Sequence, residues 1–202
     1  MELDFSQLAP LDAYRWLAST VTPRPIAWVS SISREGVSNL APFSFFQVIS
    51  DEPPTLMVNV NHHGDGSLKD TLRNVQATGE LVIQLVSFAH AEQMNASSAG
   101  FEHGVSEFER CQIGSTASRL IAPPRVTDSV IAFECKVAEI QPYPRDKPNC
   151  HMIFAQVLLA HVSDAVLNDK GRVDPHKMDL VGRLGGAAYT RTLETFEMVR
   201  PG

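Results

Sequence analysis

The sequence predicts a mainly β fold, an antiparallel barrel with a few peripheral helices. Six or more extended segments rich in Val, Ile and Phe follow one another along the chain, and these residue types favour strands. The candidate helices are short and few, and they do not alternate strictly with the strands. With 202 residues, 44% of them hydrophobic, the chain can bury a core without a metal or a disulfide. A doubly wound parallel sheet is the alternative fold.

The expected strands are separated by turn-forming residues. Glu35-Gly36 predicts a hairpin loop after the first strand, and Pro53-Pro54 ends the second. Pro42 lies inside the second strand, which predicts a sheet edge or a bulge there because proline cannot donate to a ladder. The tail alternates polar and apolar residues and predicts a last, half-buried strand. In chain order the expected strands span residues 25–33, 37–50, 55–61, 81–87, 130–141, 152–162 and 192–199.

Four short helices are expected, at residues 11–19, 67–77, 89–99 and 106–110. Pro10 is compatible with an early turn of the first. The second has the clearest signals: Ser67 and Asp70 fit a helix-start box in which the serine caps the helix, and Gly79 is typical of a helix end.

Composition excludes several classes of partner. The chain has 17 basic and 23 acidic residues and a net charge of −6, which disfavours a nucleic-acid-binding surface. No apolar run approaches the roughly 18 residues of a membrane span, and the acidic N-terminus lacks the features of a signal peptide. Three cysteines at irregular spacing indicate neither a disulfide framework nor a zinc site. We therefore expect a soluble cytoplasmic protein.

Metal and nucleophile chemistry find little support. His62 and His63 are adjacent, so on a strand they face opposite sides and do not easily bind one ion, and the same objection applies to Cys150-His151. No G-x-S-x-G segment occurs, and no cysteine has a local activating partner. We expect neither a metal centre nor a hydrolase site.

The segment from residue 59 to 71 is the densest candidate for a ligand site. It reads as a strand, a loop with two glycines, and a helix start, and free N–H groups at a helix N-terminus favour an anion such as phosphate. Lys69 adds a charge, and Ser67 and Thr71 add hydroxyl donors. An ordinary capped helix after a flexible turn explains the same pattern.

Two further segments have alternative interpretations. Around Pro42, the sequence Asn-Leu-Ala-Pro-Phe-Ser-Phe-Phe at 39–46 could expose backbone groups to a flat heterocycle between aromatic walls, or it could be a core strand with a bulge. The glycine-rich segment 181–189, with Arg183 and Tyr189, could let the backbone approach a ligand closely, or it could be a tight turn.

Taken together, these motifs resemble the flavin reductase-like, FMN-binding split-barrel family. The ordered set is Thr-Pro-Arg-Pro-Ile-Ala-Trp-Val-Ser-Ser at 22–31, Glu35-Gly36, the 39–46 segment, Pro53-Pro54, Lys-Asp-Thr at 69–71 and the 182–189 segment. The resemblance implies a six-stranded antiparallel split barrel at residues 21–190, with an N-terminal helical extension at 1–20 and a C-terminal strand or tail at 191–202. It also implies a homodimer with FMN near the dimer interface.

The resemblance further implies hydride transfer from NADH or NADPH through FMN to flavin or another small acceptor, with no catalytic side chain. An electron carrier, or the flavin-binding partner of a monooxygenase, is the alternative. Lys69 to Thr71, with Ser30 and Ser31, would hold the phosphate, and the loop at 96–114 could cover the flavin. The implied cofactor-binding residues are Trp28, Ser30, Ser31, Asn39, Leu40, Ala41, Pro42, Phe43, Ser44, Phe45, Asn59, Asn61, Ser67, Lys69, Asp70, Thr71, Arg183 and Tyr189.

Overall fold

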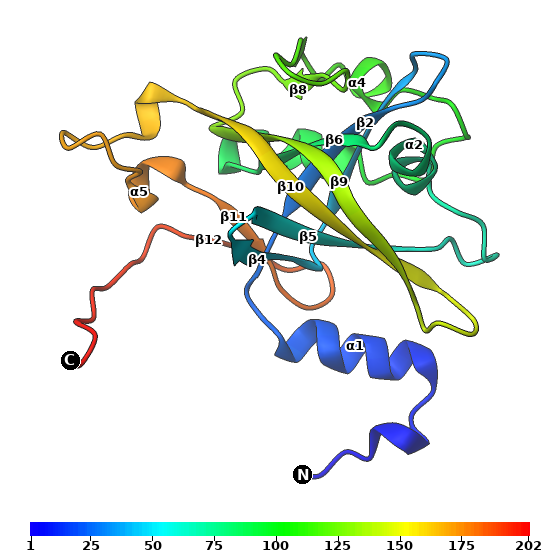
Figure 1. Ribbon diagram of the computed structural model, residues 1–202. Helices are drawn as coiled ribbons and strands as arrows, with labels where there is room; N and C mark the ends of the chain where they lie inside the picture. Colours follow the sequence, from blue (N-terminus) through cyan, green and yellow to red (C-terminus); the bar gives the residue numbers. More distant parts are fainter.

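The computed structural model describes all 202 residues, and its centre is one antiparallel sheet that curves into a barrel (Figure 1). The sheet has the strand order β3-β2-β6-β9-β10-β5-β4, and every neighbouring pair is antiparallel. Its strands are β2 (Ala27–Ile32), β3 (Ser38–Phe43), β4 (Phe46–Asp51), β5 (Pro54–Asn61), β6 (Glu80–Leu85), β9 (Ile131–Tyr143) and β10 (Cys150–Val162). The predicted mainly β split-barrel class is therefore confirmed.

The predicted strand at 37–50 is two strands, which is why the sheet has seven strands where six were expected. Only Ser44 and Phe45 separate β3 from β4, yet these strands form opposite edges of the sheet. β3 also lies against β5, so the chain crosses between the two edges at this point and brings them together. The prediction that Pro42 lies on an edge strand is confirmed, since β3 pairs only with β2.

The predicted strand at 192–199 is wrong. Residues 192–199 have no regular structure, and Phe196, Met198 and Val199 are exposed. The last strand, β12 (Tyr189–Arg191), ends just before this tail, and the tail pairs with no strand despite its alternating pattern. The short strands form two minor sheets, β1 (Arg24–Pro25) with β11 (Val181–Arg183) and β12, and β7 (Ser115–Thr116) with β8 (Arg125–Val126).

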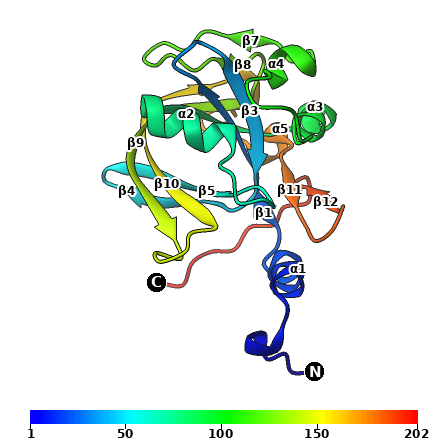
Figure 2. The same cartoon turned by 90° about the vertical axis from the view of Figure 1, so that its right-hand side faces the viewer.

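The helices lie outside the barrel, as Figure 2 shows. They are α1 (Pro10–Thr20), α2 (Asp70–Thr78), α3 (Ala91–Ala96), α4 (Glu107–Arg110) and α5 (Pro175–Met178), with 3-10 turns at Phe5–Gln7, Phe88–His90 and Asp164–Val166. α1, α2 and α4 correspond closely to expected helices, whereas the expected helix at 89–99 is a 3-10 turn followed by the shorter α3. None of these helices has the length and apolarity needed to cross a bilayer.

The predicted capping box at the start of α2 is wrong in its details. The N-cap residue is Lys69, which forms no side-chain cap bond, and α2 begins at Asp70. The Ser67 hydroxyl and amide both donate to Asp65 Oδ1, at 2.7 and 2.8 Å, so an Asx-type turn engages the serine before the helix begins. The predicted stop is confirmed: Gly79 has φ +71° and ends α2.

The core fixes α2 beside the barrel edge. Leu72 and Val75 of α2 are buried in the main hydrophobic cluster together with β2, β5 and β6 side chains. Full burial of each such side chain contributes about 1.5–3 kcal/mol. Because α2 packs on β2 and β3, its N-terminus is held close to the edge strand β3.

α1 is attached mainly through a buried arginine and otherwise stands apart from the barrel (Figure 1). The Arg24 guanidinium donates to the carbonyl oxygens of Ala18 and Val21 at the end of α1, and to that of Leu184 at 3.1 Å. Leu11, Tyr14 and other large apolar side chains of α1 are exposed. The helix is therefore held at its C-terminal end with an uncovered apolar surface.

Candidate functional site

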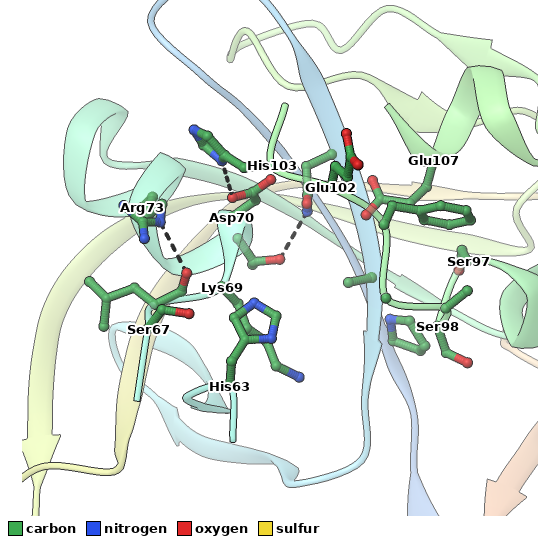
Figure 3. A pocket seen from close by; sticks show the side chains of 18 of the residues that line it. His63, Ser67, Lys69, Asp70, Arg73, Ser97, Ser98, Glu102, His103 and Glu107 are labelled. Atoms are coloured by element: carbon green, nitrogen blue, oxygen red, sulfur yellow. Dashed lines mark hydrogen bonds and ion pairs between the residues drawn. The ribbon is translucent and has the colours of Figure 1, made fainter. Parts of the chain in front are cut away.

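A cavity of about 770 Å³, within the usual range for small-molecule sites, lies between β3, the start of α2 and the loop before α4. In Figure 3 the side chains of His63 and Lys69 lie on the α2 side of this cavity, and those of Ser97, Ser98 and Glu107 lie on the other. We call it the main cavity. It is lined by Asn39, Ala41, Pro42, Phe43, His63, Gly64, Asp65, Ser67, Leu68, Lys69, Asp70, Thr71, Arg73, Ser97, Ser98, Ala99, Gly100, Phe101, Glu102, His103 and Glu107.

The α2 side of the cavity presents a cation and free hydrogen-bond donors. Lys69 is half-buried, and its ammonium group has no carboxylate or hydrogen-bond partner. Nζ lies 5.7 Å from the centroid of the Phe43 ring, and burial lowers the pKa of this lysine. Since no side chain caps α2, its first amide groups also lack side-chain acceptors. An anion placed here would satisfy both groups.

Thr71 connects this helix start to the edge strand. Its Oγ1 accepts a hydrogen bond from Asn39 Nδ2 at 2.9 Å, and both side chains are buried. Because the oxygen accepts, the hydroxyl hydrogen of Thr71 remains available to a ligand. The bond also fixes the spacing between β3 and α2.

Glu107 lines the main cavity, although no sequence pattern points to it. Its carboxyl is buried, and Oε2 accepts the Leu40 N–H at 2.7 Å. Burial raises the pKa of Glu107 despite this hydrogen bond. A single glutamate in a short helix carries no motif, so only the structure reveals that it fixes the outer edge of β3.

The loop of residues 98–105 forms the wall opposite Lys69 and is held at three points. At one end, Trp28 Nε1 donates to Ser97 Oγ at 2.9 Å, and at the other the hydroxyls of Ser38 and Ser106 are 2.9 Å apart. In the middle, the Asp70 carboxylate bonds to two groups of the loop. Oδ1 lies 2.5 Å from His103 Nδ1, and Oδ2 accepts the Gly104 N–H at 3.1 Å. The Asp70 carboxylate therefore binds the loop and does not point at an anion beside Lys69.

The structure brings about half of the implied cofactor-binding residues together. Those that line the main cavity are Asn39, Ala41, Pro42, Phe43, Ser67, Lys69, Asp70 and Thr71. Those that line a smaller adjoining cavity are Pro42 and Phe43 again, with Ser44, Arg183 and Tyr189. Those that line neither are Trp28, Ser30, Ser31, Leu40, Phe45, Asn59 and Asn61.

The two serines of β2 are occupied elsewhere. Ser30 donates its hydroxyl to the Pro124 carbonyl at 2.5 Å, and Ser31 accepts from Asn74 Nδ2 at 3.1 Å. Both are fully buried, because β2 is covered on both faces. Neither serine lines the main cavity with Lys69, and a role for them toward the phosphate stays a prediction.

The other implied cofactor-binding residues that line neither cavity make contacts within the fold. Trp28 is buried in the second hydrophobic cluster and reaches the main cavity only through Ser97. Phe45 lies near Arg24, and Asn59 donates to Asn61 at 2.7 Å along β5. Leu40 is fully buried, and its amide is bonded to Glu107 as described above.

One histidine pair was not anticipated. His62 Nε2 and His151 Nδ1 are 3.1 Å apart, and the rings stack with centroids 5.1 Å apart. Burial and the neighbouring His62 lower the pKa of His151. No group of three or more His, Cys, Asp or Glu side chains is placed to hold a metal ion.

Comparison with known proteins identifies relatives along the whole chain. The model of the flavin reductase like domain matches residues 19–174. An uncharacterized protein of Aquifex aeolicus is 39% identical over 178 residues, which cover 88% of this chain and 89% of that protein.

Two solved structures are close in shape. Nitrilotriacetate monooxygenase component B from Bacillus cereus is 30% identical with a TM-score of 0.93, and 98% of each chain is covered. The 2-nitrobenzoate 2-nitroreductase of Pseudomonas fluorescens is 31% identical with a TM-score of 0.90, covering 100% of this chain and 96% of the other. From the family match, the relatives and the fold together, this chain belongs to the flavin reductase-like family.

Proposed function

We propose that the protein binds FMN in the main cavity and is an oxidoreductase that passes hydride or electrons from NADH or NADPH through FMN to flavin or another small acceptor. The observation that carries the proposal is the half-buried Lys69 ammonium, which has no anionic partner at the uncapped start of α2. Membership of the flavin reductase-like family supports the choice of FMN.

The phosphate of FMN fits the donors on the α2 side. It carries nearly two negative charges, so it would pair with Lys69 and accept from the first amides of α2 and the Thr71 hydroxyl. Asp70 does not oppose this arrangement, because His103 and Gly104 engage its carboxylate.

The edge strand β3 suits a flat heterocycle. Pro42 and Phe43 supply apolar surface at the cavity wall. Pro42 has no N–H, and the Leu40 N–H is bonded to Glu107, so this part of the edge offers carbonyl acceptors more than donors. Carbonyl acceptors match the N3–H donor on the pyrimidine edge of a flavin.

When bound, FMN supplies the hydride and electron chemistry, and the chain supplies binding and orientation. The loop of residues 98–105, held by Asp70, lines the side of the cavity opposite Lys69. We assign no catalytic acid or base, since hydride transfer through a flavin needs none from the protein.

The test is a pair of measurements on the purified protein. FMN titration is expected to show saturable binding, and anaerobic addition of NADH or NADPH is expected to bleach the bound flavin. Binding without bleaching by either nucleotide would remove the nicotinamide half of the proposal. Failure to bind FMN would remove all of it.

A second candidate is a flavoprotein electron carrier or the flavin-supplying partner of a monooxygenase. Similarity to a monooxygenase component B favours the partner role. Reduction of the bound FMN by a protein donor, together with no response to NADH or NADPH, would select the carrier. Stimulation of a monooxygenase by the reduced protein would select the partner role.

We also propose that the protein forms a homodimer, as the family resemblance implies. Leu11, Tyr14 and Leu17 of α1, and Val48 and Ile49 of β4, are large apolar side chains that are exposed in the single chain. Burying them in a symmetric interface would remove this apolar surface from water. Light scattering is expected to give twice the chain mass, and a monomer at all concentrations would refute the proposal.

A further inference from the structure

A smaller cavity of about 240 Å³ opens off the main cavity, and we call it the annex. The two share Pro42, Phe43 and Ser98, so the annex lies directly beside the main cavity. Arg183 of β11 and Tyr189 of β12 line the annex, and so do Met94 and Asn95 of α3. The annex is lined by Ile26, Pro42, Phe43, Ser44, Met94, Asn95, Ser98, Arg183 and Tyr189.

Arg183 brings an unpaired positive charge to this wall. Its guanidinium carbon lies 4.4 Å from the centroid of the Tyr189 ring, and Nη2 donates to the Gly186 carbonyl at 2.5 Å. It has no carboxylate partner, and no acidic side chain lines the annex. Arg191 on the neighbouring strand provides the contrast, because Asp179 pairs with it at 2.5 Å. The Arg183 side chain is therefore held in one orientation, while no carboxylate neutralises its positive charge.

A second arginine increases the positive field. Arg24 lies opposite Arg183 in the β1–β11 pairing, is buried, and bonds only to carbonyls and one hydroxyl. That hydroxyl is Ser44, whose Oγ accepts from Arg24 Nε at 3.3 Å. Because the oxygen accepts, the Ser44 hydrogen is left to donate into the annex. An anion there would meet a guanidinium and a hydroxyl donor, with a second guanidinium behind.

The size and lining restrict the class of anion. The volume is below the ~300 Å³ at which drug-sized pockets begin, so it suits one ring and not a dinucleotide. Ile26, Phe43 and Met94 give it an apolar side. A free phosphate would satisfy the cations and leave these side chains without contacts, whereas an aromatic carboxylate would use both.

We propose that the annex binds a small aromatic carboxylate beside the flavin, with Arg183 and Ser44 holding the carboxylate and the Tyr189 side bordering the ring. This proposal rests on the proposed function, because the aromatic carboxylate would be the acceptor of the electrons that FMN passes on. The protein would then prefer aromatic acceptors that carry a carboxylate over neutral aromatic ones of the same size.

The test uses benzoate and benzamide as redox-inert probes, titrated calorimetrically into the FMN-loaded protein and into the flavin-free protein. Benzoate is expected to bind at least about tenfold more tightly than benzamide, a difference that one charge-assisted contact can supply. Arg183→Gln is expected to remove this preference. Arg172→Gln, at an exposed arginine whose side chain forms no hydrogen bond, is the matched control and is expected to retain it.

Three outcomes would overturn the proposal. Equal affinities for benzoate and benzamide in the unaltered protein would exclude a carboxylate site. A larger loss of FMN than of riboflavin affinity in Arg183→Gln would assign Arg183 to the cofactor phosphate. A larger loss of ADP-ribose than of benzoate affinity would assign it to the nicotinamide dinucleotide. If FMN itself fails to bind while benzoate binds to the flavin-free protein, the proposed function fails and the annex remains a carboxylate site.

Discussion

Replacing Lys69 by methionine separates the charge of this residue from its packing. Methionine keeps a flexible apolar side chain near Phe43 and removes the ammonium group. The half-buried lysine has no competing carboxylate, so the whole of its charge is available to a phosphate. A hydrogen bond to a charged group contributes about 1.5–3 kcal/mol, which corresponds to about 10- to 150-fold in Kd.

The expected signature is a change in the ratio of two affinities. Lys69→Met should weaken FMN by about 10- to 150-fold and riboflavin by less than about threefold, because riboflavin lacks the phosphate. Lys147→Met, at an exposed lysine in the β9–β10 turn, is the control for a general loss of positive charge and should leave both affinities near their original values. Fluorescence titration of both flavins measures the ratio, and equal weakening of FMN and riboflavin would refute the reasoning.

The same lysine predicts a pH dependence. Burial lowers the pKa of Lys69 in the free protein, and a bound phosphate would raise it again. The contribution of the charge is therefore complete below the free-protein pKa and falls as the pH rises through it toward the bound-state value. FMN affinity should decline over this alkaline range in the unaltered protein, and neither riboflavin nor the Lys69→Met variant should show the decline.

Three other predictions test the supporting structure. His103→Ala removes one of the two bonds from the loop to Asp70, so amide exchange in residues 98–105 should accelerate by mass spectrometry while global unfolding changes little; unchanged exchange would show that the bond does not hold the loop. Glu134→Ala leaves His161 and the amides of Arg119 and Leu120 without their buried acceptor and should cost about 3 kcal/mol in urea unfolding. Burial raises the pKa of Glu134, but these hydrogen bonds outweigh it and hold the pKa below its usual value. The contribution of Glu134 to the free energy of unfolding should therefore be lost as the pH falls through that lowered pKa, and the same loss of stability at acid pH in Glu134→Gln would contradict this. Burial raises the pKa of Cys135 to about 12, so iodoacetamide should leave this thiol unmodified at pH 8 until the protein unfolds; rapid labelling of the native protein would contradict its burial.

Much of the fold can be read from the sequence because its strands are long runs of β-branched and aromatic residues. The break at Ser44 and Phe45 could not be, because Phe-Ser-Phe-Phe continues the apolar pattern without a turn signal. It is barrel closure that separates β3 from β4. The tail shows the opposite limit, since residues 192–199 have a strand pattern but pair with no strand.

The candidate site also has residues that the sequence reveals and residues that only the fold reveals. Lys69, Thr71, Asn39 and the 41–43 segment line the main cavity, and they could be selected from the sequence because a helix start and a proline-containing edge strand leave local marks in it. Ser30 and Ser31 do not line it, since a central strand buries both faces and neighbouring groups occupy the hydroxyls. Glu107 was missed because its role depends on a contact with Leu40, 67 positions away, which no local pattern encodes.

The most direct test of the account is a crystal structure of the protein with FMN. The phosphate is expected within hydrogen-bonding distance of Lys69 Nζ and the first amides of α2, with the ring against Pro42 and Phe43. A phosphate bound at Arg183, or a flavin bound outside the main cavity, would contradict it.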